Sequence, residues 1–231
     1  MKRLCTICAR GGSKGVPNKN IRQMVGKPLI GHSILQAQSS GLFEAIAVSS
    51  DSMKILDISK KFGVDYSVFR PKELASDLAP KLPAIQHCVN EVETLSGKKF
   101  DVIVDLDATS PLRITKDIEG AVRLLEDENV SNVITGCPAR RSPYFNLVER
   151  DEDGYVRLSK TPEQTILRRQ DAPECFDMNA SIYVWKRAGL IGSESIFNAD
   201  TLLFVMPEER SIDMDHEWEF EYVEFLFNKR T

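Results

Sequence analysis

A glycine-rich, basic loop at residues 9–20 carries the residue types that bind polyphosphate. Three glycines and three basic residues make up half of it: Gly11, Gly12, Gly15, Arg10, Lys14 and Lys19. Glycine allows backbone conformations in which several N–H groups point into one concavity. Guanidinium and ammonium groups around such donors suit a polyphosphate better than a single carboxylate. From the residues alone, the alternative is a solvated basic turn.

The loop matches neither of the common phosphate-binding fingerprints. Walker-type loops need four residues between two glycines and then Gly-Lys-Ser/Thr, and the dinucleotide fingerprint needs Gly-x-Gly-x-x-Gly. Neither spacing occurs between residues 9 and 20. The sequence therefore argues against a P-loop ATPase and against an NAD-dependent enzyme.

Two pairs of aspartates are candidate ligands for a hard cation. Asp213 and Asp215 lie two apart on an extended segment, so their side chains point to the same side and can hold one ion jointly. The alternative is that one of them caps the helix that follows. Asp105 and Asp107 follow the apolar residues 102–104 and precede Thr-Ser-Pro. They suit either a metal ion or the hydroxyls of a sugar.

Alternating apolar segments predict the elements that position these residues. Strands are expected at 4–9, 45–48, 66–69, 102–104, 130–135, 182–185 and 202–206. Helices are expected at 28–41, 53–62, 82–95 and 117–126, with a last one whose inner face carries Trp218, Tyr222, Phe225 and Leu226. Short strands that are apolar on both faces indicate an α/β fold, a doubly wound and mainly parallel sheet covered by helices. Ligands of such sheets bind beyond the carboxyl ends of the strands, where the basic loop lies.

One stretch interrupts this alternation. Residues 137–175 are rich in Arg, Pro, Asp and Glu and lack helical periodicity, and Asp153-Gly154 between two alternating runs predicts a β-hairpin. An insertion of this kind serves as a lid or as an oligomerisation arm. We predict one domain, 1–231, with an inserted arm at about 138–177.

Composition excludes several classes of protein. The net charge of −4 gives no basic field for nucleic acid. No apolar run approaches the roughly 20 residues of a membrane span, and no signal peptide is recognisable, so we expect a cytoplasmic protein without membrane contact. The odd number of cysteines, 5, favours free thiols. Cys5 and Cys8 lie three apart on a strand and should face opposite sides, which disfavours a metal or redox site.

The order Arg-Gly-Gly-Ser-Lys-Gly-x-Pro-x-Lys-Asn closely resembles the N-terminal signature of the acylneuraminate cytidylyltransferases, the CMP-sialic acid synthetases. The resemblance recurs at separated segments through residue 226. It implies a Rossmann-like nucleotidyltransferase fold and the transfer of CMP from CTP to a nine-carbon acidic sugar. It also implies Mg²⁺ as cofactor, and a homodimer in which the inserted arm helps close the partner's sugar pocket.

The resemblance implies which residues bind the nucleotide. In the family, the loop's arginine, second lysine and asparagine hold the triphosphate, and an Arg-Pro-x-x-Leu-Ala-x-Asp segment grips the base and ribose. The corresponding residues are Arg10, Gly11, Gly12, Ser13, Lys19, Asn20, Arg70, Asp77 and Ala79. Lys81 departs from the pattern, because the family commonly has serine there.

The resemblance also implies the sugar and metal sites. The sugar-binding set is Asp107, Thr109, Ser110, Arg169, Asp177, Asn179 and Tyr183, and Ser-Ile-Asp-x-Asp gives the metal pair Asp213 and Asp215. Asp107 replaces a typical glutamine, and Asp177 replaces the arginine that meets the sugar carboxylate. An acceptor other than N-acetylneuraminate, such as legionaminic acid, is therefore expected. The alternative is that another cation, Arg140, Arg141 or Arg168, takes the carboxylate.

The implied reaction is attack of the sugar's anomeric hydroxyl on the α-phosphorus of CTP. We expect Arg10 and Lys19 to stabilise the leaving pyrophosphate and Asp215 to help deprotonate the hydroxyl, so these three are the predicted catalytic residues. Two alternatives stay open: a cytidylyltransferase for the eight-carbon acid of lipopolysaccharide, and a nucleotide-binding protein without catalysis.

Overall fold

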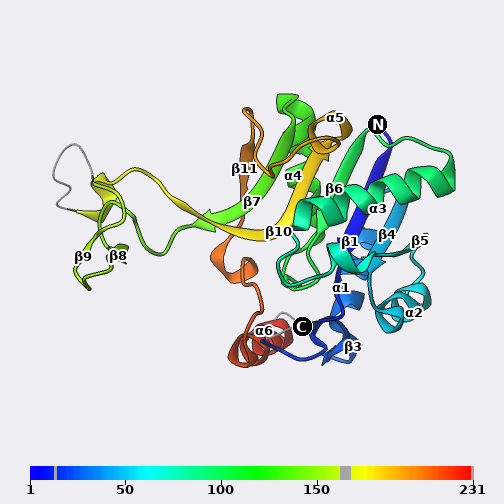
Figure 1. Cartoon of the computed structure of the whole chain (residues 1–231), viewed down its shortest axis with the longest axis horizontal. Helices are drawn as coiled ribbons and strands as arrows, with labels where there is room; N and C mark the ends of the chain where they lie inside the picture. Colours follow the sequence, from blue (N-terminus) through cyan, green and yellow to red (C-terminus); the bar gives the residue numbers. More distant parts are fainter. Residues whose placement is uncertain (13–14, 162–167, 230–231) are drawn as a thin grey trace.

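The computed structural model describes residues 1–12, 15–161 and 168–229. Its centre is a seven-stranded sheet in the order β11-β7-β10-β6-β1-β4-β5 (Figure 1). The strands are β1 Arg3–Cys8, β4 Ala45–Ser50, β5 Tyr66–Phe69, β6 Val102–Leu106, β7 Asn132–Pro138, β10 Phe176–Lys186 and β11 Leu202–Val205. Neighbours pair in parallel except β10, which is antiparallel to both β6 and β7. The predicted class, a mainly parallel α/β sheet, is confirmed.

Helices cover both faces of this sheet. One face packs against α1 Leu29–Ser40, α2 Met53–Lys61 and α4 Thr115–Glu128, and the other against α3 Lys81–Ser96 and the short α5 Arg187–Leu190. Cys5 packs in the first of these two cores and Cys8 against the second, and all five cysteines are free. The prediction that Cys5 and Cys8 face opposite sides is confirmed.

The strand order places a crevice at the carboxyl ends of β1 and β6. From β1 the chain moves outward through β4 and β5, and then returns to β6 on the other side of β1. At such a reversal the connections leave the two central strands in opposite directions, which opens a binding site between them. The basic loop follows β1, and the segment beginning at Asp107 follows β6, so both border this crevice.

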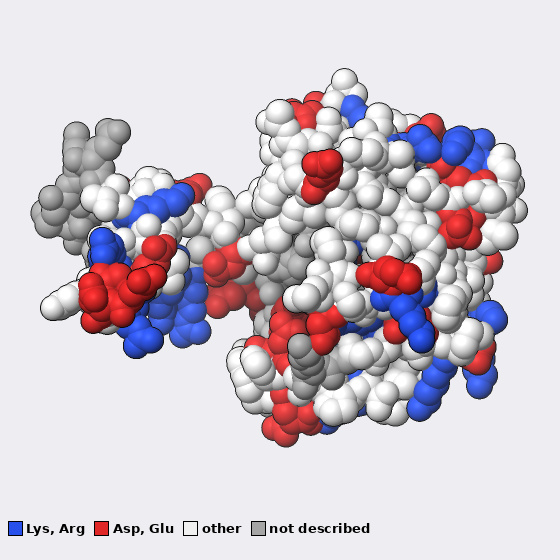
Figure 2. Space-filling model, viewed as in Figure 1, with Lys and Arg blue, Asp and Glu red and all other residues white. Residues whose placement is uncertain are grey.

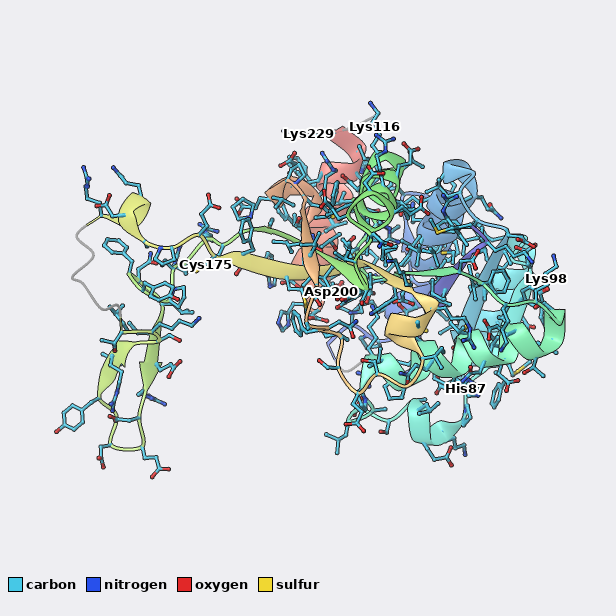
Figure 3. The ribbon with its side chains drawn as sticks, turned by 90° about the horizontal axis from the view of Figure 1, so that it is seen from above. His87, Lys98, Lys116, Cys175, Asp200 and Lys229 are labelled. Atoms are coloured by element: carbon cyan, nitrogen blue, oxygen red, sulfur yellow. The ribbon has the colours of Figure 1, made fainter. Side chains whose placement is uncertain are left out.

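A long arm projects from the body of the molecule (Figure 1). Its neck is the extension of β7 and β10, where Phe176–Met178 pair with Gly136–Pro138 after a register shift, and Ala180 has a φ of 52°. Its far end carries the hairpin of β8 Val148–Arg150 and β9 Val156–Leu158. The hairpin predicted around Gly154 is therefore confirmed. Figure 2 shows the arm as a separate lobe on a narrow neck, and Figure 3 places Cys175 at that neck.

The last helix is α6 Glu217–Lys229, which follows the stretch that carries the aspartate pair. It packs on the small hairpin of β2 Gln23–Met24 and β3 Lys27–Pro28. Phe220 and Val223 form its buried face, and Leu226 is partly buried. Trp218, Tyr222 and Phe225 are 62%, 46% and 53% exposed, so the predicted inner face was wrong for these three. Met24, Leu29 and Met214 pack against the face of the helix that carries Phe220 and Val223, and this packing sets its orientation.

Four 3₁₀ turns complete the described structure: η1 Lys19–Ile21, η2 Lys72–Leu74, η3 Arg169–Asp171 and η4 Glu208–Arg210. Over the described residues, no helix is both long and apolar enough to cross a membrane.

Candidate active site

A cavity of about 500 Å³ opens at the carboxyl ends of β1 and β6. The basic loop, the segment after β5, the start of α3, the segment after β6 and the extended stretch before α6 all line it. Among the sequence-predicted residues, those that line it are Arg10, Lys19, Asn20, Arg70, Asp77, Ala79, Asp107, Thr109, Asp213 and Asp215. The structure thus brings the predicted triphosphate, base, sugar and metal residues to one place.

Side chains from other segments hold the start of the basic loop. Arg10 forms an ion pair of 2.7 Å with Asp77, and its guanidinium also donates to the carbonyl of Ser76 at 3.3 Å. The side-chain amide of Asn20 donates to the carbonyl of Arg10 at 2.9 Å. The backbone N–H of Gly11 donates to Asp51 at 2.8 Å, a contact that the sequence did not predict. The loop arginine is therefore oriented by a carboxylate before any phosphate arrives.

The second loop cation reaches across to the aspartate pair. The ammonium of Lys19 donates to the carbonyl of Met214 and forms an ion pair of 3.0 Å with Asp215. Gly15 lies against the same stretch, because a Cβ placed on it would come within 1.9 Å of the Asp215 carbonyl oxygen. Only a glycine allows this approach. The basic loop and the aspartate pair thus form one wall.

A partly buried ion triad forms the floor beside β6. The ammonium of Lys81 lies 2.7 Å from Oδ2 of Asp107 and 3.0 Å from Oδ2 of Asp105. Burial would lower the pKa of Lys81, but the two carboxylates raise it above its usual value. Burial would raise the pKa of Asp107, but Lys81 and hydrogen bonds from Thr109 hold it well below its usual range. Lys81 and Asp107 are therefore charged near neutral pH.

Arg113 was not predicted as a site residue, yet it supports the segment after β6. It is 1% exposed, and its guanidinium donates to the carbonyls of Asp107 at 2.7 Å and Ser181 at 3.1 Å. It also donates to the hydroxyl of Ser33 on α1. An arginine this deeply buried needs such partners. The only sequence signal was its place at the end of Thr-Ser-Pro-Leu-Arg.

The predicted metal pair faces the same cavity. Burial raises the pKa of Asp213, and the carboxylates of Asp107 and Asp215 raise it further. Negative charge is therefore concentrated here. The described residues contain no cluster of three or more His, Cys, Asp or Glu side chains that could hold a metal ion. Two carboxylates nevertheless fit Mg²⁺, which usually binds through one or two of them together with substrate phosphates and water.

Other predicted residues lie outside the cavity lining. Ser110, Asn179 and Tyr183 are buried, Gly11 is partly buried and Gly12 is exposed. Asn179 links β7 to the stretch before Asp213, because it accepts a hydrogen bond from Thr135 at 2.6 Å and donates to Ser211 at 2.9 Å. Ser13 and the side chain of Arg169 fall outside the described residues, so their predicted roles stay predictions.

Asp177 and the candidate arginines belong to the arm. Asp177 is exposed at the start of β10, where its Oδ2 accepts the backbone N–H of Arg140 at 3.2 Å. Arg140, Arg141 and Arg168 are exposed on the arm as well. None of the four lines the cavity of its own chain. A role in sugar binding, as predicted for Asp177, would require the arm to reach a second copy.

Comparisons with known proteins agree with this geometry. The family model described as Cytidylyltransferase matches residues 4–211. The chain is 45% identical over 228 residues to the post-translational flagellin modification protein B of Campylobacter coli and to the CMP-N,N'-diacetyllegionaminic acid synthase of Campylobacter jejuni. In both cases this covers 99% of this chain and 96% of the relative. The solved structure of CMP:2-keto-3-deoxy-manno-octonic acid synthetase complexed with CTP has the same fold, with a TM-score of 0.72, 17% identity and full coverage of both chains.

Proposed function

The chain belongs to the cytidylyltransferase family, and from this premise we propose that it transfers CMP from CTP to the anomeric hydroxyl of a nonulosonic acid, with release of pyrophosphate. Legionaminic acid is the acceptor that we favour, because of the 45% identity to a CMP-N,N'-diacetyllegionaminic acid synthase. The observation that carries the proposal is the single cavity shared by the basic loop, the segment after β6 and the aspartate pair. A protein that only bound a nucleotide would have little need for an aspartate pair next to the basic loop.

The triphosphate of CTP would occupy the side of the cavity formed by the basic loop. Arg10 and Lys19 would exchange their carboxylate partners, Asp77 and Asp215, for phosphate oxygens. Charge-assisted hydrogen bonds of this kind are stronger than neutral ones. Arg70, which is buried and donates to Ser49 at 2.9 Å, would form the base-facing wall together with Ala79.

Transfer of the nucleotidyl group depends on positioning and charge neutralisation. The anomeric hydroxyl attacks the α-phosphorus in line, and the bond from that phosphorus to the pyrophosphate oxygen breaks. Arg10 and Lys19 would stabilise the charge that develops on the leaving group. Asp215, which lines the cavity next to Lys19, would accept the proton of the attacking hydroxyl.

Asp213 and Asp215 would hold Mg²⁺, since both are carboxylates that line the cavity. The ion, when bound, would supply positive charge that neutralises the phosphates. Met214 lies between the two aspartates and is fully buried in the hydrophobic cluster on which α6 packs. This burial fixes the stretch against the body. The protein thus presents the two carboxylates from a segment that is anchored at its centre.

The proposal includes a homodimer. The arm exposes large apolar side chains, among them Val148 at 55%, Tyr155 at 74% and Val156 at 65%. An exposed apolar patch of this kind is typical of a surface that another protein covers. A second copy would bring Asp177 and the arm arginines toward an acceptor pocket. The cytoplasmic location expected from the sequence stays a prediction.

The experiment that tests the function is pyrophosphate release with CTP and Mg²⁺. N,N'-diacetyllegionaminic acid, N-acetylneuraminate and the eight-carbon acid 2-keto-3-deoxy-manno-octonate are compared in parallel, with UTP and ATP in place of CTP as controls. We expect CTP-dependent release that is fastest with legionaminic acid and that EDTA abolishes. If none of the three acids supported pyrophosphate release, the proposal would be contradicted. A strong preference for another acid would contradict the choice of acceptor.

A further inference from the structure

One ammonium group bridges two carboxylates on the floor of the cavity. Nζ of Lys81 lies within 3.0 Å of Oδ2 of both Asp105 and Asp107. Among the residues that the structure describes, Lys81 is the only lysine or arginine that pairs with Asp105, whose side chain is fully buried. The proposed reaction gave this triad no role.

The other oxygen of each carboxylate is already engaged. Oδ1 of Asp105 accepts the hydroxyl of Thr6 at 2.8 Å. Oδ1 of Asp107 accepts the backbone N–H of Thr109 at 2.9 Å and its hydroxyl at 2.7 Å. An ionised carboxylate offers about four acceptor positions. Three of those on Asp107 are filled, so one position remains on Oδ2, the oxygen that Lys81 holds.

Lys81 connects two parts of the cavity that the chain makes separately. It begins α3, directly after the segment that includes Arg70 and Asp77, and it reaches the strand end of β6. Its ammonium lies 4.7 Å from the centre of the Tyr183 ring on β10, and its side chain is 28% exposed. A cation at a helix N-terminus is unfavourable by itself. The two carboxylates therefore hold Lys81 in place, and Lys81 in turn holds them.

We propose that Lys81 is a positioning residue that sets acceptor specificity. Its ion pairs fix the Asp107 carboxylate so that the free position on Oδ2 receives one donor of the acceptor sugar, a hydroxyl or an N-acyl N–H. This inference rests on the proposed function and names the residue that orients its acceptor site. Without Lys81, the Asp107 carboxylate would lose the ion pair that orients it and would turn away from its present orientation.

The test is a double-mutant cycle of Lys81→Met and Asp107→Asn. Steady-state kinetics give kcat and the KM of the acceptor, and calorimetry gives the Kd of CTP without acceptor. We expect Lys81→Met to lower kcat/KM for the acceptor about 10- to 100-fold, the range for one hydrogen bond to a charged group, with the Kd of CTP changed less than about threefold. In the Asp107→Asn background, removal of Lys81 should add little further loss. Lys81→Arg should recover part of the activity, and Lys60→Met, on the outer face of α2, should have no effect.

Three results would overturn the inference. The first is a large loss of CTP affinity in Lys81→Met with an unchanged KM for the acceptor, which would mean that Lys81 contacts the nucleotide. The second is equal losses on removing Lys81 with and without the Asp107 carboxylate. The third is full activity of Lys81→Met. If Lys81→Met fails to fold by thermal melting, Lys81→Arg and Lys81→Gln replace it in the same cycle.

The proposed function is tested separately by the wild-type chain. If the wild-type chain turned over none of the acceptors, the function itself would be refuted. If the wild-type chain were active and the Lys81 variants had the same kinetics, only this inference would be refuted.

Discussion

At the scale of residues, the four Lys and Arg side chains described in the cavity lining are already paired with oxygen atoms of the protein. Arg10 contacts Asp77, Lys19 contacts Asp215, and Arg70 donates to the carbonyl of Ser49. Lys81 completes the set with its two carboxylates. Such pairing keeps the cations oriented before the substrate arrives, so little reorganisation is needed when phosphates replace the carboxylates.

Gly15 carries a prediction about this arrangement. A Cβ at this position would lie 1.9 Å from the Asp215 carbonyl oxygen, a backbone atom that has no room to move aside as a side chain would. Gly15→Ala should therefore push the basic loop away from the aspartate pair. A displacement of about 1 Å in a reacting constellation can cost about 100-fold in rate. We expect a loss of that order in kcat/KM for CTP, measured by pyrophosphate release.

Gly12→Ala is the matched comparison in the same loop. A Cβ on Gly12 would meet no atom within 4 Å, so its substitution should cost clearly less than that of Gly15. Equal losses in the two variants would show that the loop tolerates no added methyl group anywhere. The close contact with Asp215 would then explain nothing. Far-ultraviolet circular dichroism of both variants checks that the fold is retained.

At the scale of elements, Glu93 fastens the C-terminal end of α3. Its side chain is 1% exposed and accepts two hydrogen bonds from Arg187 of α5, at 2.8 and 2.9 Å, and one from Lys99 at 2.6 Å. Burial would raise the pKa of Glu93, but these hydrogen bonds outweigh it and lower the pKa to about 2. This carboxylate joins α3 to α5, and Gln86 of α3 adds a second link by donating to the carbonyl of Leu190 at 2.8 Å.

The lowered pKa predicts how stability depends on pH. A carboxyl group whose folded pKa lies below its unfolded value adds stability above the unfolded value, and loses it as the pH falls toward the folded value. Since one pKa unit corresponds to about 1.4 kcal/mol, Glu93→Gln should lower the free energy of unfolding at pH 7 by roughly 3 kcal/mol. The difference from the wild-type chain should shrink as the pH falls from about 4.5 toward 2. Urea denaturation across this range measures it.

Glu91→Gln provides the control, because Glu91 is exposed on the same helix. Its substitution should leave the stability and its pH dependence close to those of the wild-type chain. A Glu93→Gln difference that stayed constant between pH 7 and pH 3 would mean that the lost stability comes from packing and not from ionisation.

Local patterns were enough to predict most elements, and tertiary contacts decided the rest. The run at 66–69 is strand β5 with the same bounds, since its residues and flanking turns carry the whole signal. The direction of β10 was open, because no local pattern states which neighbour a strand pairs with. The inner face of α6 was misassigned because both sides of that helix carry aromatic residues. Only packing against Met24 and Met214 distinguishes them.

The same division holds for the site. The rule that ligands bind at strand ends was enough to bring the basic loop and Asp107 together, and the resemblance added the aspartate pair to the same site. The ion pair of Lys81 with Asp107 joins residues 26 positions apart, and the hydrogen bond from Arg113 to Ser181 joins residues 68 positions apart, which sequence spacing does not encode. A lysine at the start of a helix was nevertheless a signal, since it needs nearby carboxylates to offset the helix dipole.

At the scale of the whole molecule, the arm and α6 both expose apolar side chains. Trp218, Tyr222 and Phe225 recur at helical spacing along one face of α6, and each is at least 46% exposed. Tyr155 and Val156 are exposed at the far end of the arm. Burying apolar area stabilises an assembly by about 25 cal/mol per Å². Since the arm projects away from its own body, only another molecule can cover its end (Figures 1 and 2).

The proposed dimer predicts that the far end of the arm matters for acceptor use but not for CTP. Tyr155→Ser together with Val156→Asp removes apolar area and adds a charge on the hairpin, which should convert a dimer into a monomer in light scattering after size exclusion. Because Asp177 and the arm arginines do not line the active-site cavity of their own chain, kcat/KM for the acceptor should fall by about 10-fold or more while the Kd of CTP stays unchanged. Glu152→Gln, an exposed polar change in the same turn, should alter neither property. A wild-type chain that is monomeric at the concentration of the assay and fully active would contradict the dimer, and so would a monomeric variant that uses the acceptor normally.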